Sequence, residues 1–169
     1  AVPIKITQTK PEEINVESFL RSLEDEPTLM IIANPNSPTG AHLKIEELER
    51  IIADAELAGT IVLIDETYFE FSGLTCSKLI PKYENLVICR SLSKGFGLAG
   101  CRMGYLMSQS RTAGILYQFK AGWEVNQLGI LAAHIMLDNP EIIHEQKADV
   151  EAGRQRLEQI CKLNGWPYY

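Results

Sequence analysis

The sequence predicts an α/β fold with a mostly parallel sheet that is flanked by helices. Two observations predict it. Short apolar, β-branched runs alternate with helical patterns, and the first three of these runs each end in a polar cluster. With 169 residues, the chain is long enough for one domain with an apolar core.

The elements follow from local patterns. The apolar run at 29–33 is expected to be a strand that ends at Asn34-Pro35. A helix is expected over 45–59, because apolar residues recur at helical spacing before the stop at Gly59. Three further strands are expected at 60–66, 85–91 and 101–108.

The rest of the chain reads as helical. The segments 109–121 and 126–138 are expected to be helices, and the second is apolar enough to be buried. A long amphipathic helix is expected to begin at Pro140, after a capping Asn139, and to stop at Gly165. It places the apolar residues Ile143, Val150 and Leu157 on one face.

Composition excludes several functions. A net charge of −6 without a basic run argues against nucleic acid as a partner. The longest apolar run, 128–137, is too short to span a bilayer, so no membrane association is expected. The irregularly spaced cysteines and histidines favour reduced thiols, a cytoplasmic protein and no metal site.

Polar clusters follow three of the expected strands, at 34–40, 65–68 and 91–97. Parallel strands end at one edge of a sheet, where ligands of open α/β sheets bind. The three clusters are therefore predicted to form one site.

The segment Gly95 to Gly100 spells GxGxxG, the pattern typical of dinucleotide binding. That pattern requires a helix directly after the glycines and an acidic residue about 20 positions later. Here an expected strand follows, and position 120 is lysine. The glycines are instead expected to let the backbone pass close to a ligand.

The chemistry centres on Lys94, whose amine can form a Schiff base with the aldehyde of a phosphorylated cofactor. Ser91, Ser93 and Arg102 can hold a phosphate. Asp65 can keep a pyridine nitrogen protonated, and Tyr68 can donate to a ring oxygen. Each residue also has a plainer explanation: a strand-end cap for Asp65, a half-buried phenol for Tyr68, a surface ion pair for Arg102 and a solvated amine for Lys94.

Three ordered motifs, NPNSPTG (34–40), IDETYFEF (64–71) and SLSKGFGLAGCRMGY (91–105), together resemble the large domain of fold-type-I, pyridoxal-phosphate-dependent aminotransferases of class I/II. The resemblance is closest to the histidinol-phosphate aminotransferase group. GWEVNQLGILAA (122–133) is similar to a segment of that group and of the related threonine-phosphate decarboxylases.

The resemblance implies pyridoxal 5'-phosphate as cofactor, Lys94 as the catalytic Schiff-base lysine that carries the proton between substrate and cofactor, and a set of further cofactor-binding residues: Ser37, Asp65, Tyr68, Ser91, Ser93 and Arg102. Ser37 departs from the family pattern, which usually has asparagine there to bond the ring oxygen. Because serine has a shorter reach, that contact is either missing, bridged by water or supplied by Asn36. Glu66 is expected to be structural, since adjacent strand residues point to opposite faces.

The resemblance also implies domains and partners. Residues 1–139 are expected to be part of a large domain, and 140–169 a helix that leads toward a small domain. Nothing in the chain matches the family's second phosphate-binding turn, its ring-stacking aromatic residue or its carboxylate-binding arginine. The chain is therefore expected to be a fragment that binds cofactor weakly by itself.

The implied activity is transamination between amino acids and 2-oxo acids in a homodimer. Two alternatives stay open. One is a lyase of the threonine-phosphate decarboxylase type, and the other is a non-catalytic remnant of the cofactor site that serves as an interaction domain.

Overall fold

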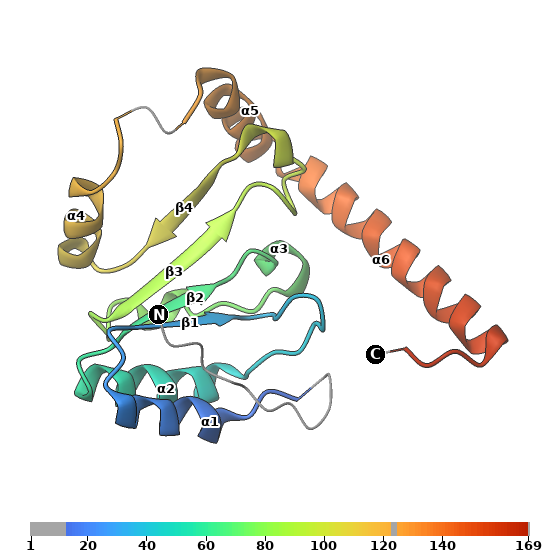
Figure 1. Cartoon of the computed structure of the whole chain (residues 1–169). Coiled ribbons are helices and arrows are strands. Elements are labelled where there is room, and N and C mark those ends of the chain that lie inside the picture. The colour runs from blue at the N-terminus through green and yellow to red at the C-terminus, as the bar shows by residue number, and fades with distance from the viewer. Residues whose placement is uncertain (1–12, 123–124, 169) are drawn as a thin grey trace. The chain divides into compact units, whose positions relative to one another are not determined.

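The computed structural model describes residues 13–122 and 125–168, and the chain forms two compact units (Figure 1). The first unit comprises the described residues of Ala1–Ser91 and Gly104–Glu124, and the second those of Leu92–Met103 and Val125–Tyr169. The predicted division into 1–139 and 140–169 concerns the domains of a longer protein, and it stays a prediction.

The first unit is built on a four-stranded sheet in the order β1-β2-β3-β4. The strands are β1 (Leu29–Ala33), β2 (Ile61–Asp65), β3 (Leu86–Ser91) and β4 (Gly104–Met107). The first three strands are parallel, and β4 is antiparallel to β3. All four predicted strands and the mostly parallel α/β fold are therefore confirmed.

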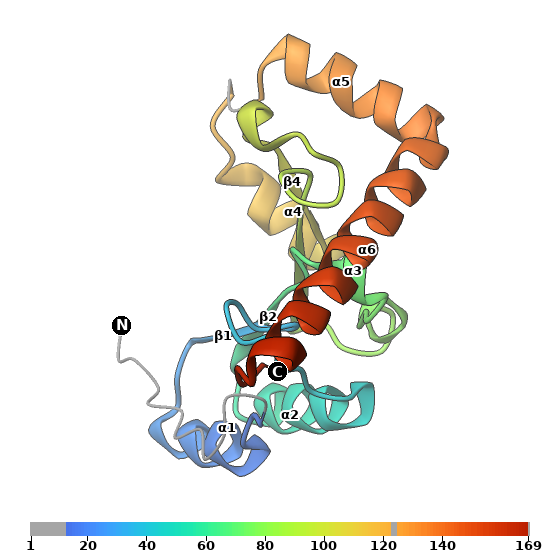
Figure 2. The same ribbon diagram turned by 90° about the vertical axis from the view of Figure 1, so that its right-hand side faces the viewer.

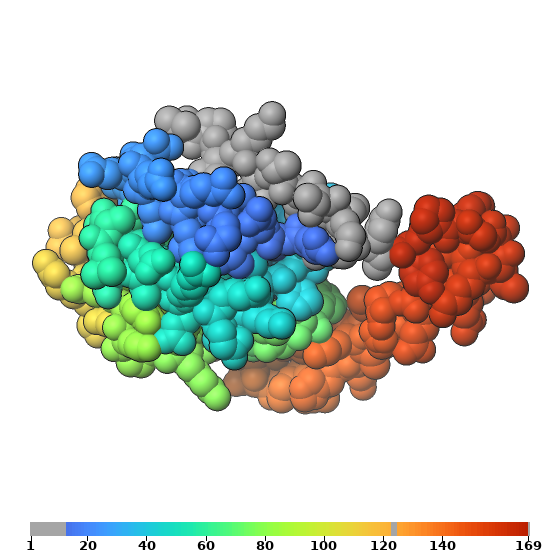
Figure 3. Space-filling view, turned by 90° about the horizontal axis from the view of Figure 1, so that it is seen from below, coloured from blue at the N-terminus to red at the C-terminus, as the bar shows by residue number. Residues whose placement is uncertain are grey.

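The described residues of the first unit also form four helices. They are α1 (Val16–Ser22), α2 (Ile45–Leu57), the single turn α3 (Phe69–Ser72) and α4 (Ser110–Gln118), with 3₁₀ turns at Leu23–Asp25 and Ser77–Leu79. The helices α1 and α2 lie side by side below the sheet (Figure 1), and Figure 3 shows that their surfaces adjoin. The sequence reading did not predict α1.

The core of the first unit lies between the sheet and the helices α1 and α2. Its fully buried side chains include Met30, Val62, Leu48 and Ile51, contributed by β1, β2 and α2. Period-2 alternation puts the odd-numbered residues of β1 on the opposite face, where Leu29 and Ile31 are exposed. The edge of the sheet at which β1, β2 and β3 end therefore lies next to a well-packed core.

The second unit contains the long helices α5 (Gln127–Asp138) and α6 (Pro140–Asn164), which meet at an angle (Figure 2), and a 3₁₀ turn at Ala99–Cys101. Its small core consists of Leu92, Phe96, Ala133 and Met136. As predicted, α6 has Pro140 in its first turn, and it ends at Gly165, whose φ of 65° is in the left-handed region.

One expectation for these helices was wrong. The helix α5 is not buried overall, because only one face, with Gly129, Ala133 and Met136, packs, while Leu128 is 79% exposed. Asn139 is the N-cap residue of α6, as predicted, but its side chain makes no capping bond, since its Nδ2 donates to the carbonyl oxygen of Ile135, at 2.8 Å.

Candidate active site

The polar clusters follow the carboxyl ends of adjacent parallel strands. Ala33, the last residue of β1, pairs with Asp65, the last residue of β2, and Asp65 pairs with Cys89 of β3. Asn34 and Ser91 therefore lie near the same edge of the sheet as Asp65. The first unit brings these three residues together as the sequence predicts.

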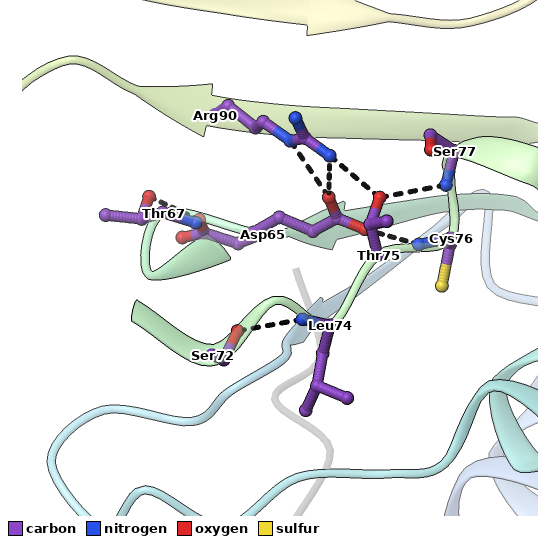
Figure 4. Close-up of polar contacts among 9 residues, drawn as sticks. Asp65, Thr67, Ser72, Leu74, Thr75, Cys76, Ser77 and Arg90 are labelled. Carbon is purple, nitrogen blue, oxygen red and sulfur yellow. Dashed lines mark hydrogen bonds and ion pairs between the residues drawn. The ribbon is translucent and has the colours of Figure 1, made fainter. Parts of the chain in front are cut away.

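Asp65 shapes the turn that follows β2. Its Oδ1 accepts hydrogen bonds from the backbone N–H of Thr67, at 2.9 Å, and from the Thr67 hydroxyl, at 2.5 Å (Figure 4). The carboxylate also acts on the neighbouring strand. Burial, and then the charge of Asp65, raise the pKa of the Cys89 thiol. The plainer reading of Asp65 as a strand-end cap is thus correct, and it leaves room for a second role.

Glu66 points the opposite way, into the core. Its Oε2 accepts from Nε and Nη2 of Arg90, at 3.0 and 2.9 Å, and its Oε1 accepts from the backbone N–H of Cys76, at 2.6 Å (Figure 4). The Glu66 residue is only 1% exposed. The structure agrees with the prediction that Glu66 is structural.

Arg90 is held on several sides. Its Nη2 also donates to Oγ1 of Thr75, at 2.7 Å, and its guanidinium carbon lies 3.5 Å from the centre of the Phe69 ring. Burial works against the charge of Arg90, but hydrogen bonds with Tyr105 and Glu66 outweigh it and raise the pKa of Arg90. The group is therefore a permanent cation.

Tyr68 and Ser37 line a common hollow in the first unit. The cavity has a volume of about 390 Å³ and is bounded by the following residues: Pro35, Asn36, Ser37, Pro38, Gly40, Tyr68, Phe71 and Ser72. The structure thus brings the NPNSPTG segment against the turn that carries Tyr68. Mostly apolar walls with a few hydroxyl and amide groups are typical of small-molecule sites.

The NPNSPTG segment is fixed by its own asparagines. Asn34, which is 2% exposed, accepts from the Leu43 N–H through Oδ1, at 2.7 Å, and donates to the Leu43 carbonyl, at 3.2 Å. Asn36 donates through Nδ2 to Oγ1 of Thr39, at 2.8 Å. The Asn36 amide therefore takes part in a bond within the segment, while Ser37 is exposed.

Lys94 lies in the second unit, in a loop closed by main-chain bonds. The N–H of Leu98 donates to the carbonyl of Leu92, and the N–H of Gly97 donates to the carbonyl of Lys94, both at 2.9 Å. Leu92 and Phe96 are buried on either side of Lys94, whose own side chain is exposed. Gly97 has a φ of 66°, a value that favours glycine. The loop passes into a 3₁₀ turn, which the sequence did not predict, and then into β4, which it did.

Arg102 follows the same loop. Its φ of 53° is uncommon for a residue with a Cβ, and its Nη1 donates to the carbonyl of Ala99, at 3.2 Å. Ser93, next to Lys94, is half-buried. The candidate residues are thus divided, and the first unit carries Ser37, Asp65, Tyr68 and Ser91, while the second carries Ser93, Lys94 and Arg102.

The sequence reading missed Arg90 and its partners Thr75 and Tyr105. The sequence contained one signal for this group. Arg90 interrupts the apolar run of β3, and it occupies the strand face whose other residues are buried. A buried arginine requires a buried anion. The anion is Glu66, the carboxylate that the sequence predicted to be structural.

Within residues 13–122 and 125–168, no helix is both long and apolar enough to cross a membrane. No group of three His, Cys, Asp or Glu side chains in these ranges is arranged to hold a metal ion.

The four-stranded, mostly parallel α/β fold is the one found in pyridoxal-phosphate-dependent aminotransferases. The chain belongs to the aminotransferase class I and II family, whose family model matches residues 1–169.

Curated relatives agree with this assignment. The chain is 34% identical over 158 residues to histidinol-phosphate aminotransferase 2 of Haemophilus influenzae, covering 91% of this chain and 43% of that protein. It is 32% identical to the histidinol-phosphate aminotransferase of Thermoanaerobacter sp., covering 100% of this chain and 48% of that protein. The chain thus spans less than half the length of these relatives.

Solved structures share the fold. Histidinol-phosphate aminotransferase from Sinorhizobium meliloti, in complex with pyridoxal-5'-phosphate, matches with a TM-score of 0.79 and 26% identity, over 92% of this chain and 44% of that one. L-Threonine-O-3-phosphate decarboxylase from Porphyromonas gingivalis matches with a TM-score of 0.61 and 30% identity, over 67% of this chain and 36% of that one.

Proposed function

We propose that this chain forms the cofactor-binding part of an aminotransferase that resembles the histidinol-phosphate aminotransferases and acts on amino acids and 2-oxo acids. One observation carries the proposal. Lys94 lies in a closed loop three residues after the end of β3, and Asp65 is the last residue of the neighbouring strand β2. An amine and a carboxylate are the two groups that a pyridine aldehyde requires, the amine for its aldehyde and the carboxylate for its ring nitrogen.

The donor set of the chain fits pyridoxal phosphate. Asp65 offers a carboxylate for the ring nitrogen, and Tyr68 a phenol for the ring hydroxyl. Hydroxyl groups of Ser91 and Ser93 and the guanidinium of Arg102 suit a phosphate. Ser37 is assigned to the wall of the same site, because it shares a hollow with Tyr68.

The residues have distinct tasks. When bound, the cofactor supplies an aldehyde and a protonated ring that draws electrons from the substrate. Asp65 keeps the ring nitrogen protonated, because a nearby anion favours the charged form. The Nζ of Lys94 would hold the cofactor at its aldehyde, with loss of water, and would move the substrate proton once the substrate amine has displaced it. Tyr68 orients the ring through its hydroxyl oxygen.

Reductive trapping tests the assignment. The chain is incubated with pyridoxal phosphate, treated with borohydride and mapped by peptide mass spectrometry. The pyridoxyl label is expected on Lys94, and the Lys94→Ala variant should lose it. A matched control is Lys78→Ala, which removes another exposed lysine and should keep it. Label spread evenly over the lysines, or absent, would contradict the proposal and favour the non-catalytic remnant.

A second reaction is supported by the likeness to L-threonine-O-3-phosphate decarboxylase. Both reactions use the same cofactor, so trapping does not separate them. The protein is therefore assayed with histidinol phosphate plus a 2-oxo acid, and separately with O-phosphothreonine. A new amino acid formed from the 2-oxo acid supports the aminotransferase, and release of carbon dioxide supports the lyase.

The proposal includes a homodimer in the cytoplasm. The four cysteines all lie within the described residues and are free thiols, which suits a reducing compartment. Leu128 and Leu131, on the open face of α5, are apolar side chains that a second subunit could cover. Sedimentation at several concentrations tests the dimer, and a single monomeric species at all of them would exclude it.

A further inference from the structure

A buried ion pair lies directly beside the two strand ends that carry Asp65 and Ser91. Glu66 and Arg90 are 1% and 9% exposed, and two bonds join them, at 2.9 and 3.0 Å (Figure 4). The pair spans from the turn after β2 to the end of β3. It therefore fixes the spacing of these two ends on the core side of the sheet.

Each member of the pair is the sequence neighbour of a candidate cofactor ligand. Asp65 precedes Glu66, and Ser91 follows Arg90. Because successive residues of extended chain point to opposite faces, holding Glu66 and Arg90 in the core directs Asp65 and Ser91 to the other side. Displacement of either core residue would turn its neighbour away.

The pair is fixed by its surroundings as well. Glu66 also accepts from the backbone of Cys76, and Arg90 donates to Thr75, so the 75–76 segment closes over the pair. The Phe69 ring stacks on the guanidinium of Arg90. Phe69 directly follows Tyr68, so the same contact restrains the turn that carries the phenol.

A buried ion pair is a poor way to gain stability. Removing two charges from water costs as much as their attraction returns, and apolar replacements are often equally stable. The pair does define one geometry, because the two bonds from Arg90 to Oε2 of Glu66 and the bonds to Cys76 and Thr75 are lost when either partner moves. Its presence behind a binding edge is therefore better explained by positioning than by stability.

We propose that Glu66 and Arg90 are positioning residues that aim Asp65 at the ring nitrogen of the bound cofactor. The inference rests on the proposed function, because it needs Asp65 to contact that nitrogen. It adds a role for two residues that touch neither cofactor nor substrate.

The test compares two cofactors that differ in one atom. One is pyridoxal phosphate, and the other is its 1-deaza analogue, in which CH replaces the ring nitrogen. Binding of each is titrated by fluorescence with the 169-residue chain. The unaltered chain should prefer pyridoxal phosphate by about tenfold or more, as expected for a hydrogen bond to a charged group.

The variant Glu66→Gln keeps the size of the side chain and an acceptor for Cys76, but loses the charge that holds Arg90. Its preference should fall to within about threefold of unity, while its affinity for the analogue stays the same. A purely structural defect would instead lower both affinities together and leave their ratio unchanged. Circular dichroism of the free variant checks that it is folded.

Two further variants complete the test. Glu17→Gln removes the carboxylate from the exposed pair with Arg50, at 2.9 Å, and should keep the full preference. Thr75→Val removes one bond from Arg90 and should give an intermediate preference, which provides the same test if Glu66→Gln does not fold.

The outcomes separate the two proposals. If the unaltered chain shows no preference, or no binding, the proposed role of Asp65 fails and this inference fails with it. If the unaltered chain prefers pyridoxal phosphate and the folded Glu66→Gln and Thr75→Val variants do so equally, only the inference is overturned.

Discussion

The guanidinium of Arg90 is stacked on the ring of Phe69, with 3.5 Å between the guanidinium carbon and the ring centre, while its Nη2 lies 2.9 Å from Oε2 of Glu66. The cation thus has an aromatic face on one side and a carboxylate at its edge. Both contacts come from the segment that follows β2. This arrangement ties the end of β3 to the turn with Asp65 and Tyr68.

Removing the cation should therefore be costly. Arg90→Met would leave the Glu66 carboxylate buried without a counter-charge, and we expect the free energy of unfolding to fall by about 3–5 kcal/mol. Urea denaturation followed by circular dichroism measures it. The double variant Glu66→Gln/Arg90→Met should recover part of the loss, because no charge is then left unpaired.

An exposed pair of the same kind provides the control. Arg50 contacts Glu17 at 2.9 Å, with more than half of each side chain exposed. Arg50→Met should cost at most about 1 kcal/mol. If both arginine variants lose the same amount, the buried pair has no special role in the fold.

Two glycines should respond in opposite ways to alanine. A Cβ at Gly104 would lie 2.6 Å from the carbonyl oxygen of Arg90, a main-chain atom that cannot move without disturbing the β3–β4 pairing. Gly104→Ala should destabilise the fold by about 1–3 kcal/mol.

Gly153 lies within α6, and nothing within 4 Å would meet its Cβ. Gly153→Ala should stabilise the helix by about 0.5–1 kcal/mol. Thermal unfolding by circular dichroism compares the two variants with the unaltered chain. Equal shifts of the two midpoints would show that the space around Gly104 is not restrictive.

The sequence predicted those parts of the fold that depend on local pattern. The four strands are apolar runs with clear ends, and Pro140 and Gly165 mark the limits of α6, so these elements were found. The short helix α1 was missed. Its seven residues, Val16–Ser22, carry only two turns of pattern, and it is stabilised by packing on α2.

Burial and side-chain partners were harder to predict, because they depend on residues that are distant in sequence. The apolar composition of α5 suggested burial on all sides, but only Gly129, Ala133 and Met136 find partners. Motif spacing selected Asp65 and Tyr68 as candidate cofactor ligands, and that assignment stays a prediction. Motif spacing could not identify the partner of Glu66, because Arg90 lies 24 residues away on another strand.

The reactivity of the cysteines should follow their burial. Burial, and then the Glu66 carboxylate, raise the pKa of the Cys76 thiol to about 12, whereas Cys101 and Cys161 are partly exposed. At pH 8, iodoacetamide should modify Cys101 and Cys161 at least about a hundredfold faster than Cys76, since the thiolate is the reactive form. Peptide mass spectrometry over time measures the rates, and equal rates in the folded protein would contradict the prediction.

Ionisation of the Cys76 thiol should make the free energy of unfolding depend on pH in the alkaline range. Its folded-state pKa is higher than its ordinary value of 9.0. The stability it contributes is therefore complete below about pH 9 and is lost as the pH rises toward 12. Cys76→Ala should remove this part of the alkaline decline, and an unchanged decline in the variant would assign it to other groups.

Glu70 should affect stability at lower pH. Its Oε2 is buried and has no hydrogen-bond partner within the described chain, and burial raises the pKa of its carboxyl. Because the folded-state pKa lies above the unfolded one, the stability contributed by Glu70 is present in acid and is lost as the pH rises through the folded-state value. The Glu70→Gln variant has no proton to lose, so its stability relative to the unaltered chain should increase between about pH 4 and 7. Urea midpoints across this range measure the difference, with Glu145→Gln, an exposed glutamate within α6, as the control that should show no such trend. A difference that is constant with pH would mean that Glu70 is as easily ionised in the folded chain as in the unfolded one.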